Sequence, residues 1–148
     1  MKRMLGLMLI VTIAGVFAVA VQASTAHHPS RHGTLHVVKD CPPSQYAGQA
    51  GGFCTITDSN LQEIRKGARV FYLEAAAGTG LESDLVLYAG PGNVAFGHVT
   101  LSFTSKTGEI TFARGTGSFR RFHAQVAVSF DGALWHWDGV YRFGQWSR

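Results

Sequence analysis

The chain has 148 residues, a formal net charge of +4 at pH 7 and two cysteines. Its basic residues are scattered, and beyond Lys2-Arg3 they are adjacent only at Arg65-Lys66 and Arg120-Arg121. A nucleic-acid-binding surface would cluster basic residues along one element, interleaved with aromatic side chains. The composition therefore argues against a nucleic-acid partner, and the length predicts one domain with its own core.

The first 23 residues have the pattern of a secretory signal peptide. Lys2 and Arg3 precede an apolar run, and Val21-Gln22-Ala23 suits a signal-peptidase site, so we expect cleavage after Ala23. The mature chain would then be secreted or periplasmic, without stable membrane insertion. The alternative is an uncleaved anchor, because the apolar run approaches the ~20 residues that span a bilayer.

Residues 24–52 are expected to form an N-terminal arm that carries the first strand, at 33–39. This arm is rich in histidine, and secreted His-rich tails can bind Cu(II), Zn(II) or Ni(II). We interpret this as adventitious affinity and predict no resident metal. The four histidines concerned are His27, His28, His32 and His36.

The two cysteines, Cys41 and Cys54, lie in a Pro- and Gly-rich part of the chain. An even number of cysteines in an exported protein predicts a structural disulfide. A catalytic or metal-binding pair is the alternative, but the C-x-x-C spacing typical of such pairs is missing.

Residues 53–148 are predicted to form a β-barrel domain. Alternating apolar and polar residues, separated by Gly-rich turns, indicate short strands, and a helical turn is expected only at 58–65. Closing an antiparallel meander into a barrel removes its exposed edges. The predicted fold is all-β, an eight-stranded antiparallel up-and-down β-barrel, with strands at 33–39, 53–57, 68–74, 84–89, 93–104, 108–114, 122–130 and 133–143.

The turns between the last three strands are the most specific local signals. Gly115-Thr116-Gly117 follows an alternating strand and leads at once to Phe119, and Asp131-Gly132 reads as a two-residue turn. Short barrel turns often need a positive φ, so we expect Gly115 and Gly117 to serve folding rather than chemistry.

Gly115 to Phe119, followed by the aromatic strand Trp137 to Phe143, resembles a pattern of the allene oxide cyclases and of the related dirigent proteins. The resemblance covers roughly residues 53–143. It implies a barrel, often a homotrimer, that needs no metal or organic cofactor. Such a barrel would hold a small hydrophobic or aromatic molecule while it cyclises or couples, acting through orientation and exclusion of water. Allene oxide cyclases carry an acidic residue in the lumen, for which Glu74 and Asp84 are candidates.

Strand alternation assigns the side chains of the last two strands to faces. In an isolated barrel the aromatic face would fill the interior and the polar face would meet water. In the other interpretation, a trimer covers outer faces and polar side chains converge in the lumen as acid or base groups. The catalytic candidates are His98, His123, His136 and Asp138, and the candidate ligand-binding aromatics are Tyr72, Phe96, Trp135, Trp137 and Tyr141.

Three functions remain open at this level. The first is an isomerase, cyclase or stereochemical guide that works in the lumen. The second is a non-catalytic carrier of apolar ligands, and the third is a structural or partner-binding surface protein. An open or a plugged lumen would discriminate the first two from the third.

Overall fold

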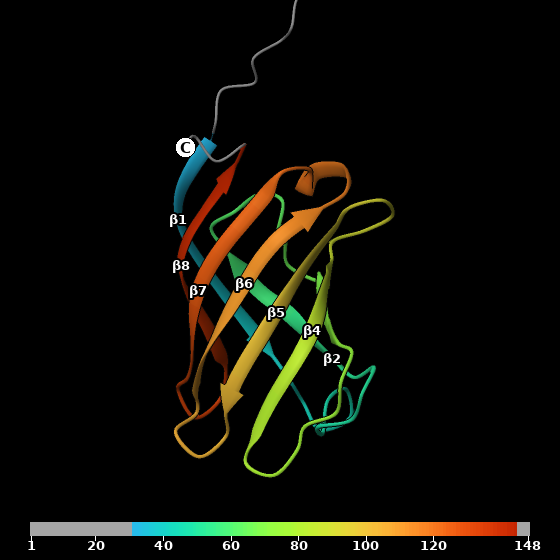
Figure 1. The fold of residues 1–148 in the computed structure, drawn as a ribbon, viewed down its shortest axis with the longest axis vertical. Helices are drawn as coiled ribbons and strands as arrows, with labels where there is room; N and C mark the ends of the chain where they lie inside the picture. The colour runs from blue at the N-terminus through green and yellow to red at the C-terminus, as the bar shows by residue number, and fades with distance from the viewer. Residues whose placement is uncertain (1–30, 145–148) are drawn as a thin grey trace, which may run out of the picture.

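A computed structural model describes residues 31–144 and confirms the predicted fold, a closed eight-stranded antiparallel up-and-down barrel (Figure 1). The predicted signal peptide, its cleavage site, His27 and His28 lie outside the described residues. No helix between residues 31 and 144 is long and apolar enough to cross a membrane. The strands are β1 (Arg31–Asp40), β2 (Phe53–Ser59), β3 (Arg69–Tyr72), β4 (Gly80–Tyr88), β5 (Val94–Ser102), β6 (Thr107–Gly115), β7 (Phe122–Phe130) and β8 (Trp135–Phe143).

The barrel closes where the first strand meets the last. β1 pairs with β8 from Arg31 opposite Phe143 to Lys39 opposite Trp135, and its other edge pairs with β2. The strand that we placed in an N-terminal arm is therefore one of the eight strands of the barrel wall. In Figure 1 the two strands run side by side in blue and red. With both edges of β1 paired, no open sheet edge is left at the closure.

Two local predictions were wrong. The segment 58–65 forms no helical turn, because β2 continues to Ser59 and the chain then makes a tight turn in which Ile64 N donates to Leu61 O at 2.9 Å. Asp131-Gly132 is not a two-residue turn, because residues 131–134 all lie between the strands and Asp131 Oδ1 accepts from the backbone N–H groups of Ala133 and Leu134, both at 2.8 Å. The one helical element among the described residues is a 3₁₀ turn, η1 (Gly117–Phe119).

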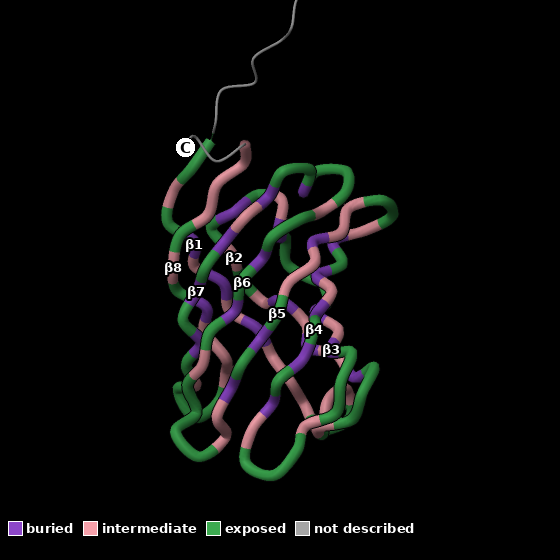
Figure 2. The backbone as a smooth tube through the Cα atoms, in the orientation of Figure 1, coloured by how far each residue is buried: buried purple, intermediate pink, exposed green. Residues whose placement is uncertain are grey.

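The interior is filled unevenly along the barrel axis. Buried residues alternate with exposed ones along most strands, so each strand presents one face to the core (Figure 2). Toward the end where β8 finishes, aromatic rings pack on one another, with Phe112 5.8 Å from Trp137 and Phe119 5.3 Å from Phe122 between ring centroids. Phe119, Phe122 and Trp137 have no exposed surface. This aromatic plug closes one end of the lumen.

The predicted disulfide between Cys41 and Cys54 is confirmed. It joins the residue after β1 to the second residue of β2 and so closes the 41–52 loop. The same loop is held by backbone bonds: Gly51 N donates to Tyr72 O at 2.7 Å, and Ala76 N donates to Gly48 O at 2.8 Å. The loop is therefore fixed across the end of the barrel opposite the aromatic plug.

The turn glycine Gly117 should be required for stability. It has φ of +56°, and an added Cβ would lie 2.4 Å from both Asn93 Oδ1 and Gly92 O. Gly67 is the matched control, because its φ is +88° but an added Cβ would meet nothing within 4 Å. Gly67→Ala should cost about 1 kcal/mol of backbone strain, and Gly117→Ala should cost more. Urea unfolding of the two variants measures the difference, and equal losses would contradict the steric argument.

The disulfide should contribute about 3 kcal/mol to the free energy of unfolding, the value that the chain-entropy model gives for a loop of about 15 residues. Alkylation of the native protein without reductant should add no label. Replacing both cysteines by Ala should lower the unfolding midpoint accordingly. Two labelled thiols in freshly isolated protein would exclude the bond.

Candidate functional site

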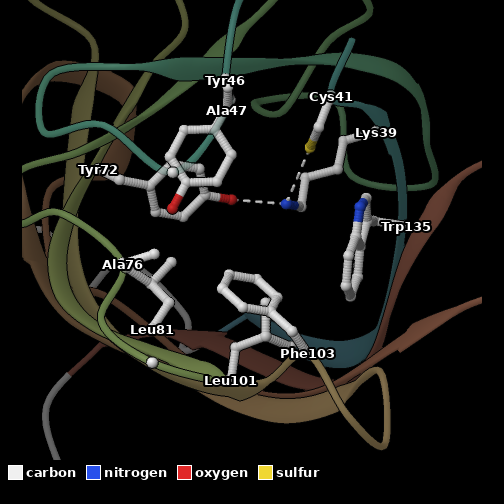
Figure 3. Close-up of a pocket in the computed structure, with 12 residues that line it drawn as sticks. Lys39, Cys41, Tyr46, Ala47, Tyr72, Ala76, Leu81, Leu101, Phe103 and Trp135 are labelled. Carbon is white, nitrogen blue, oxygen red and sulfur yellow. Dashed lines mark hydrogen bonds between the residues drawn. The ribbon is translucent and has the colours of Figure 1, made fainter. Parts of the chain in front are cut away.

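A cavity of about 420 Å³, here called the mouth cavity, lies at the end of the barrel opposite the aromatic plug. Lys39 of β1, Tyr72 of β3 and Trp135 of β8 point into it, and the 41–52 loop covers one side (Figure 3). Most of its wall is apolar or aromatic. The lining residues are Lys39, Cys41, Tyr46, Ala47, Gly48, Tyr72, Ala76, Gly78, Leu81, Leu101, Phe103 and Trp135.

Lys39 is the one charged residue among the buried residues that the structure describes, with 3 % of its surface exposed. It follows Leu35 and Val37 on the inward face of β1 because side chains alternate along a strand. The register between β1 and β2 shifts just before Lys39, which lies opposite the buried Ile56 of β2.

The Lys39 amine has three polar neighbours, and none of them is a carboxylate. Its Nζ donates to Tyr72 Oη at 2.5 Å and lies 3.5 Å from Cys41 Sγ and 3.7 Å from Cys54 Sγ. Sulfur in a disulfide is a weak acceptor, so Tyr72 is its main partner. Among the described residues no carboxylate forms an ion pair with it.

Aromatic rings surround the amine on several sides. Lys39 Nζ lies 5.2 Å from the ring centroid of Tyr72, 5.6 Å from that of Trp135 and 5.7 Å from that of Trp137. At these distances a protonated amine gains some cation–π attraction, worth up to about 2 kcal/mol when desolvated. This attraction is smaller than the cost of taking a lone ammonium group out of water.

Burial accordingly lowers the pKa of Lys39 from 10.5 to about 7. Burial also raises the pKa of Tyr72, and the neighbouring Tyr46 raises it further. At neutral pH the site thus holds a protonated phenol beside an amine that is uncharged in roughly half of the molecules. An uncharged amine has a free electron pair and can act as base or nucleophile.

Tyr46 adds a second hydroxyl to the cavity. Its ring stacks on Tyr72 with centroids 4.6 Å apart, and burial raises the pKa of its phenol. Tyr46 Oη is buried and has no hydrogen-bond partner among the described residues. Since an unsatisfied buried hydroxyl costs about 1 to 3 kcal/mol, a bound polar group at this position would stabilise the site.

The four candidate catalytic residues all lie on the outside of the barrel. His98 Nδ1 donates to Asp84 Oδ1 at 2.9 Å, His136 Nε2 donates to Asp131 Oδ2 at 2.8 Å, and Asp138 accepts from His36 Nδ1 at 2.6 Å. None of the four lines the cavity. Their pairs join neighbouring strands or hold the β7–β8 loop. A catalytic role for His98, His123, His136 and Asp138 stays a prediction.

His123 lines a different hollow, of about 630 Å³, that lies across the outer faces of β1, β6, β7 and β8. Partial burial lowers the pKa of His123, and Arg142 lowers it further. Val140 beside it is 59 % exposed. This outer hollow is larger than the mouth cavity but contains no buried charged group, so we take the mouth cavity as the candidate site.

The candidate ligand-binding aromatics divide among three places. Tyr72 and Trp135 line the cavity, and Trp137 lies beneath it in the core. Tyr141 lies opposite Gly33 toward the plugged end, six residues and about 20 Å along β8 from Trp135. Phe96 lies on the outer surface, where the Arg114 guanidinium stacks 5.2 Å from its ring centroid. The structure thus brings two of the five together in one site.

Neither carboxylate considered for the lumen lies inside it. Glu74 and Asp84 are exposed, and Glu74 Oε2 accepts from the backbone N–H of Asp84 at 2.6 Å. The interior carries an amine instead. Within residues 31–144 no group of three His, Cys, Asp or Glu side chains is placed to hold a metal ion.

Lys39 and Tyr46 were not among the residues predicted for the site. The signal for Lys39 was present, because a lysine at the third position of the alternating series Leu35, Val37, Lys39 must face the core if the strand is regular. Tyr46 gave no comparable signal. Its position depends on how the disulfide and the backbone bonds fold the 41–52 loop over the barrel end.

Comparison of the chain with protein-family models, with curated proteins and with solved structures finds no match. The fold and the site therefore define the protein by their own features: a closed antiparallel β-barrel, plugged at one end and hollow at the other, with a buried lysine in the hollow.

The buried amine should give the free energy of unfolding a distinct pH dependence. Between about pH 7 and pH 10.5 the unfolded chain keeps a proton on Lys39 that the folded protein has released, so stability rises with pH across this window. Below pH 7 Lys39 is protonated in both the folded and the unfolded chain. The folded protein then bears the full cost of burying the charged amine, roughly 5 kcal/mol at about 1.4 kcal/mol per pKa unit.

Lys39→Met removes this dependence while filling a similar volume. Between about pH 6 and about pH 9 the wild type becomes more stable because Lys39 loses its proton, whereas the variant does not. The free energy of unfolding of the variant, relative to that of the wild type, should therefore fall by roughly 2 to 3 kcal/mol over this range. Urea unfolding at both pH values tests this, and the difference between the two proteins cancels the titration of the surface histidines. A pH-independent difference would show that Lys39 keeps the pKa of an exposed lysine.

Proposed function

We propose that this protein is a small-molecule-binding barrel whose mouth cavity takes one largely apolar organic molecule, with a polar group of that molecule directed at Lys39 and Tyr72. The observation that carries the proposal is the buried amine, which faces an aromatic cavity and has no carboxylate partner within residues 31–144. Folding alone would favour an apolar residue at this position. A buried polar group at the base of an apolar pocket is the arrangement that ligand sites use to fix orientation.

The dimensions of the cavity agree with this role. Its volume of about 420 Å³ falls within the ~300 to 1,000 Å³ typical of sites for small organic ligands. Leu81, Leu101 and Phe103 offer apolar contact on the side away from Lys39 (Figure 3). A molecule with one polar end and a hydrocarbon or aromatic body matches this division of the wall.

The disulfide supports an extracellular or periplasmic location, since such bonds persist in oxidising compartments. We therefore propose that the protein meets its ligand outside the cytoplasm, in agreement with the signal peptide that the sequence pattern predicts. The cofactor-free binding expected from the resemblance to allene oxide cyclases and dirigent proteins is retained as part of this proposal.

A second candidate function is guidance of a ring closure or of a stereoselective coupling inside the cavity. The observation that favours it is the Lys39–Tyr72 pair, which places a base and an acid 2.5 Å apart. In a cavity with little water, such a pair could move a proton while the aromatic wall restricts the conformation of the substrate. A non-catalytic carrier would bind the same ligands without turnover, and a structural protein would bind none.

Binding can be located by two aromatic substitutions on the same face of β8. Trp135 lines the cavity and Tyr141 lies toward the plugged end, and both side chains are partly buried. Trp135→Ala should weaken binding of octanol, octanoic acid or a phenolic such as coniferyl alcohol about tenfold, equivalent to about 1.4 kcal/mol of lost contact. Tyr141→Ala should leave the affinity unchanged.

Isothermal titration calorimetry measures both affinities, and thermal melts give the loss of stability for each variant. Equal effects of the two substitutions would show that binding does not occur at the mouth cavity. If no compound of an alcohol, fatty-acid, epoxide, polyene and phenolic panel binds the wild type, a structural role becomes the better account.

A further inference from the structure

We infer that Lys39 is a nucleophile toward carbonyl compounds: an aldehyde that occupies the mouth cavity forms an imine with Lys39 Nζ, and Tyr72 moves the proton that this step requires. The inference rests on the proposed function, because the aldehyde must first bind in the cavity. It goes further by naming the chemical class of ligand and the bond that forms.

The surroundings of the amine are those that imine formation needs. Lys39 Nζ lies in the wall of the cavity, and its strongest partner is the Tyr72 hydroxyl at 2.5 Å (Figure 3). No carboxylate of the described residues pairs with it, so the amine lacks the partner that would best hold it in its charged form. The rings of Tyr72, Trp135 and Trp137 surround the nitrogen, and Lys39 is only 3 % exposed.

The lowered pKa of Lys39 agrees with this geometry. At about pH 7 roughly half of the Lys39 amines carry a free electron pair, whereas an exposed lysine in water is almost entirely protonated at that pH. The raised pKa of Tyr72 keeps its phenol protonated under the same conditions, so that it can serve as a proton donor.

The proposed step balances without any further reagent. The Nζ electron pair attacks the carbonyl carbon, the C–N bond forms, and the π bond of the carbonyl breaks. One proton passes from nitrogen to oxygen and gives a carbinolamine. Tyr72 then donates its proton to the carbinolamine hydroxyl, which leaves as water, and recovers a proton from nitrogen. The products are one imine and one water molecule for each amine and aldehyde consumed.

Tyr46 supplies a hydroxyl that can bind the carbonyl oxygen of the aldehyde. Its hydroxyl is buried, has no partner among the described residues and belongs to a ring stacked on Tyr72. A hydrogen bond from Tyr46 to the carbonyl oxygen would polarise the carbonyl and orient it beside Lys39. The unsatisfied hydroxyl is thereby accounted for by a ligand oxygen.

A carboxylic acid is the rival ligand, because a bound carboxylate would pair with protonated Lys39 and raise its pKa again. The apolar wall and the two phenols favour the uncharged aldehyde. Every polar atom at that end of the cavity can then be satisfied without burying a charge.

The test uses three probes of one chain length: octanal, octanol and octanoate. The protein is incubated with octanal and cyanoborohydride, which converts an imine into a stable secondary amine, and is then digested and mapped by mass spectrometry. Lys39 should be labelled at least tenfold faster than Lys66 and Lys106, both exposed lysines, which serve as internal references. Octanol should bind reversibly to the same cavity.

Three variants assign the roles of the side chains. Lys39→Arg keeps a cation but forms no imine, so labelling at this position should be lost while Lys66 is labelled as before; Lys39→Met serves if the Arg variant does not fold. Tyr72→Phe should slow labelling of Lys39 about tenfold, and by more than it lowers the affinity for octanol, whose hydroxyl also meets Tyr72. An equal loss of labelling and of octanol affinity in Tyr72→Phe would overturn the proton-transfer role.

The outcomes separate the two proposals. If octanol binds but Lys39 is labelled no faster than Lys66, imine formation is overturned and the binding function stands. If octanoate binds while octanal neither binds nor labels, the site is one for carboxylates and the inference is overturned. If none of the three probes binds, the proposed function falls as well. Fast, selective labelling of Lys39 confirms the inference.

Discussion

The pairing of β1 with β8 is the constraint on which the rest of the molecule depends. Nine residue pairs join these strands, from Arg31 opposite Phe143 to Lys39 opposite Trp135. This ladder turns a sheet with two open edges into a barrel, and so it defines an inside and an outside. It also sets the Lys39 amine beside the Trp135 ring, although the two residues are far apart in the sequence. Both the cavity and the position of Lys39 within it therefore depend on the closure of the barrel.

The interior is divided between stability and function. Near the end of β8 it is filled by aromatic side chains that contact one another in edge-on and tilted arrangements, including Phe112, Phe119 and Phe122. Such packing contributes through buried area and through ring–ring contacts, each worth roughly 0.5 to 1.5 kcal/mol beyond the area. At the other end the described residues hold a buried amine without a carboxylate partner, an unsatisfied hydroxyl and an unfilled volume. Locally unfavourable features of this kind are usually found where a protein binds or reacts.

The strands could be predicted because their signal is local. The boundaries of β7, from Phe122 to Phe130, follow from strict alternation and match the structure. The predictions failed where a side chain or a long-range contact decided the backbone. Asp131 extends its turn by accepting two backbone N–H bonds, and the spacing of Leu61 and Ile64, which suggests a helix, instead buries both residues in a loop. Sequence periodicity carries no information about such bonds.

The candidate site was less predictable than the fold, and for a physical reason. The aromatic residues Tyr72 and Trp135 were expected to contact a ligand, and they do line the cavity. The histidines attracted attention because they titrate near neutral pH, but the pleat of each strand directs them to the outer surface. Lys39 is of interest only once it is known to be buried, and Tyr46 only once the loop is placed. These facts depend on the three-dimensional structure.

The aromatic plug has one further consequence for the cavity at the other end of the barrel. A molecule that occupied this cavity would have no path through the plugged end, so it would have to leave at the end where it entered. A volume of about 420 Å³ suits one occupant at a time. Chemistry within one molecule, or between one molecule and the wall, fits this arrangement better than the joining of two bulky partners that would have to enter in succession.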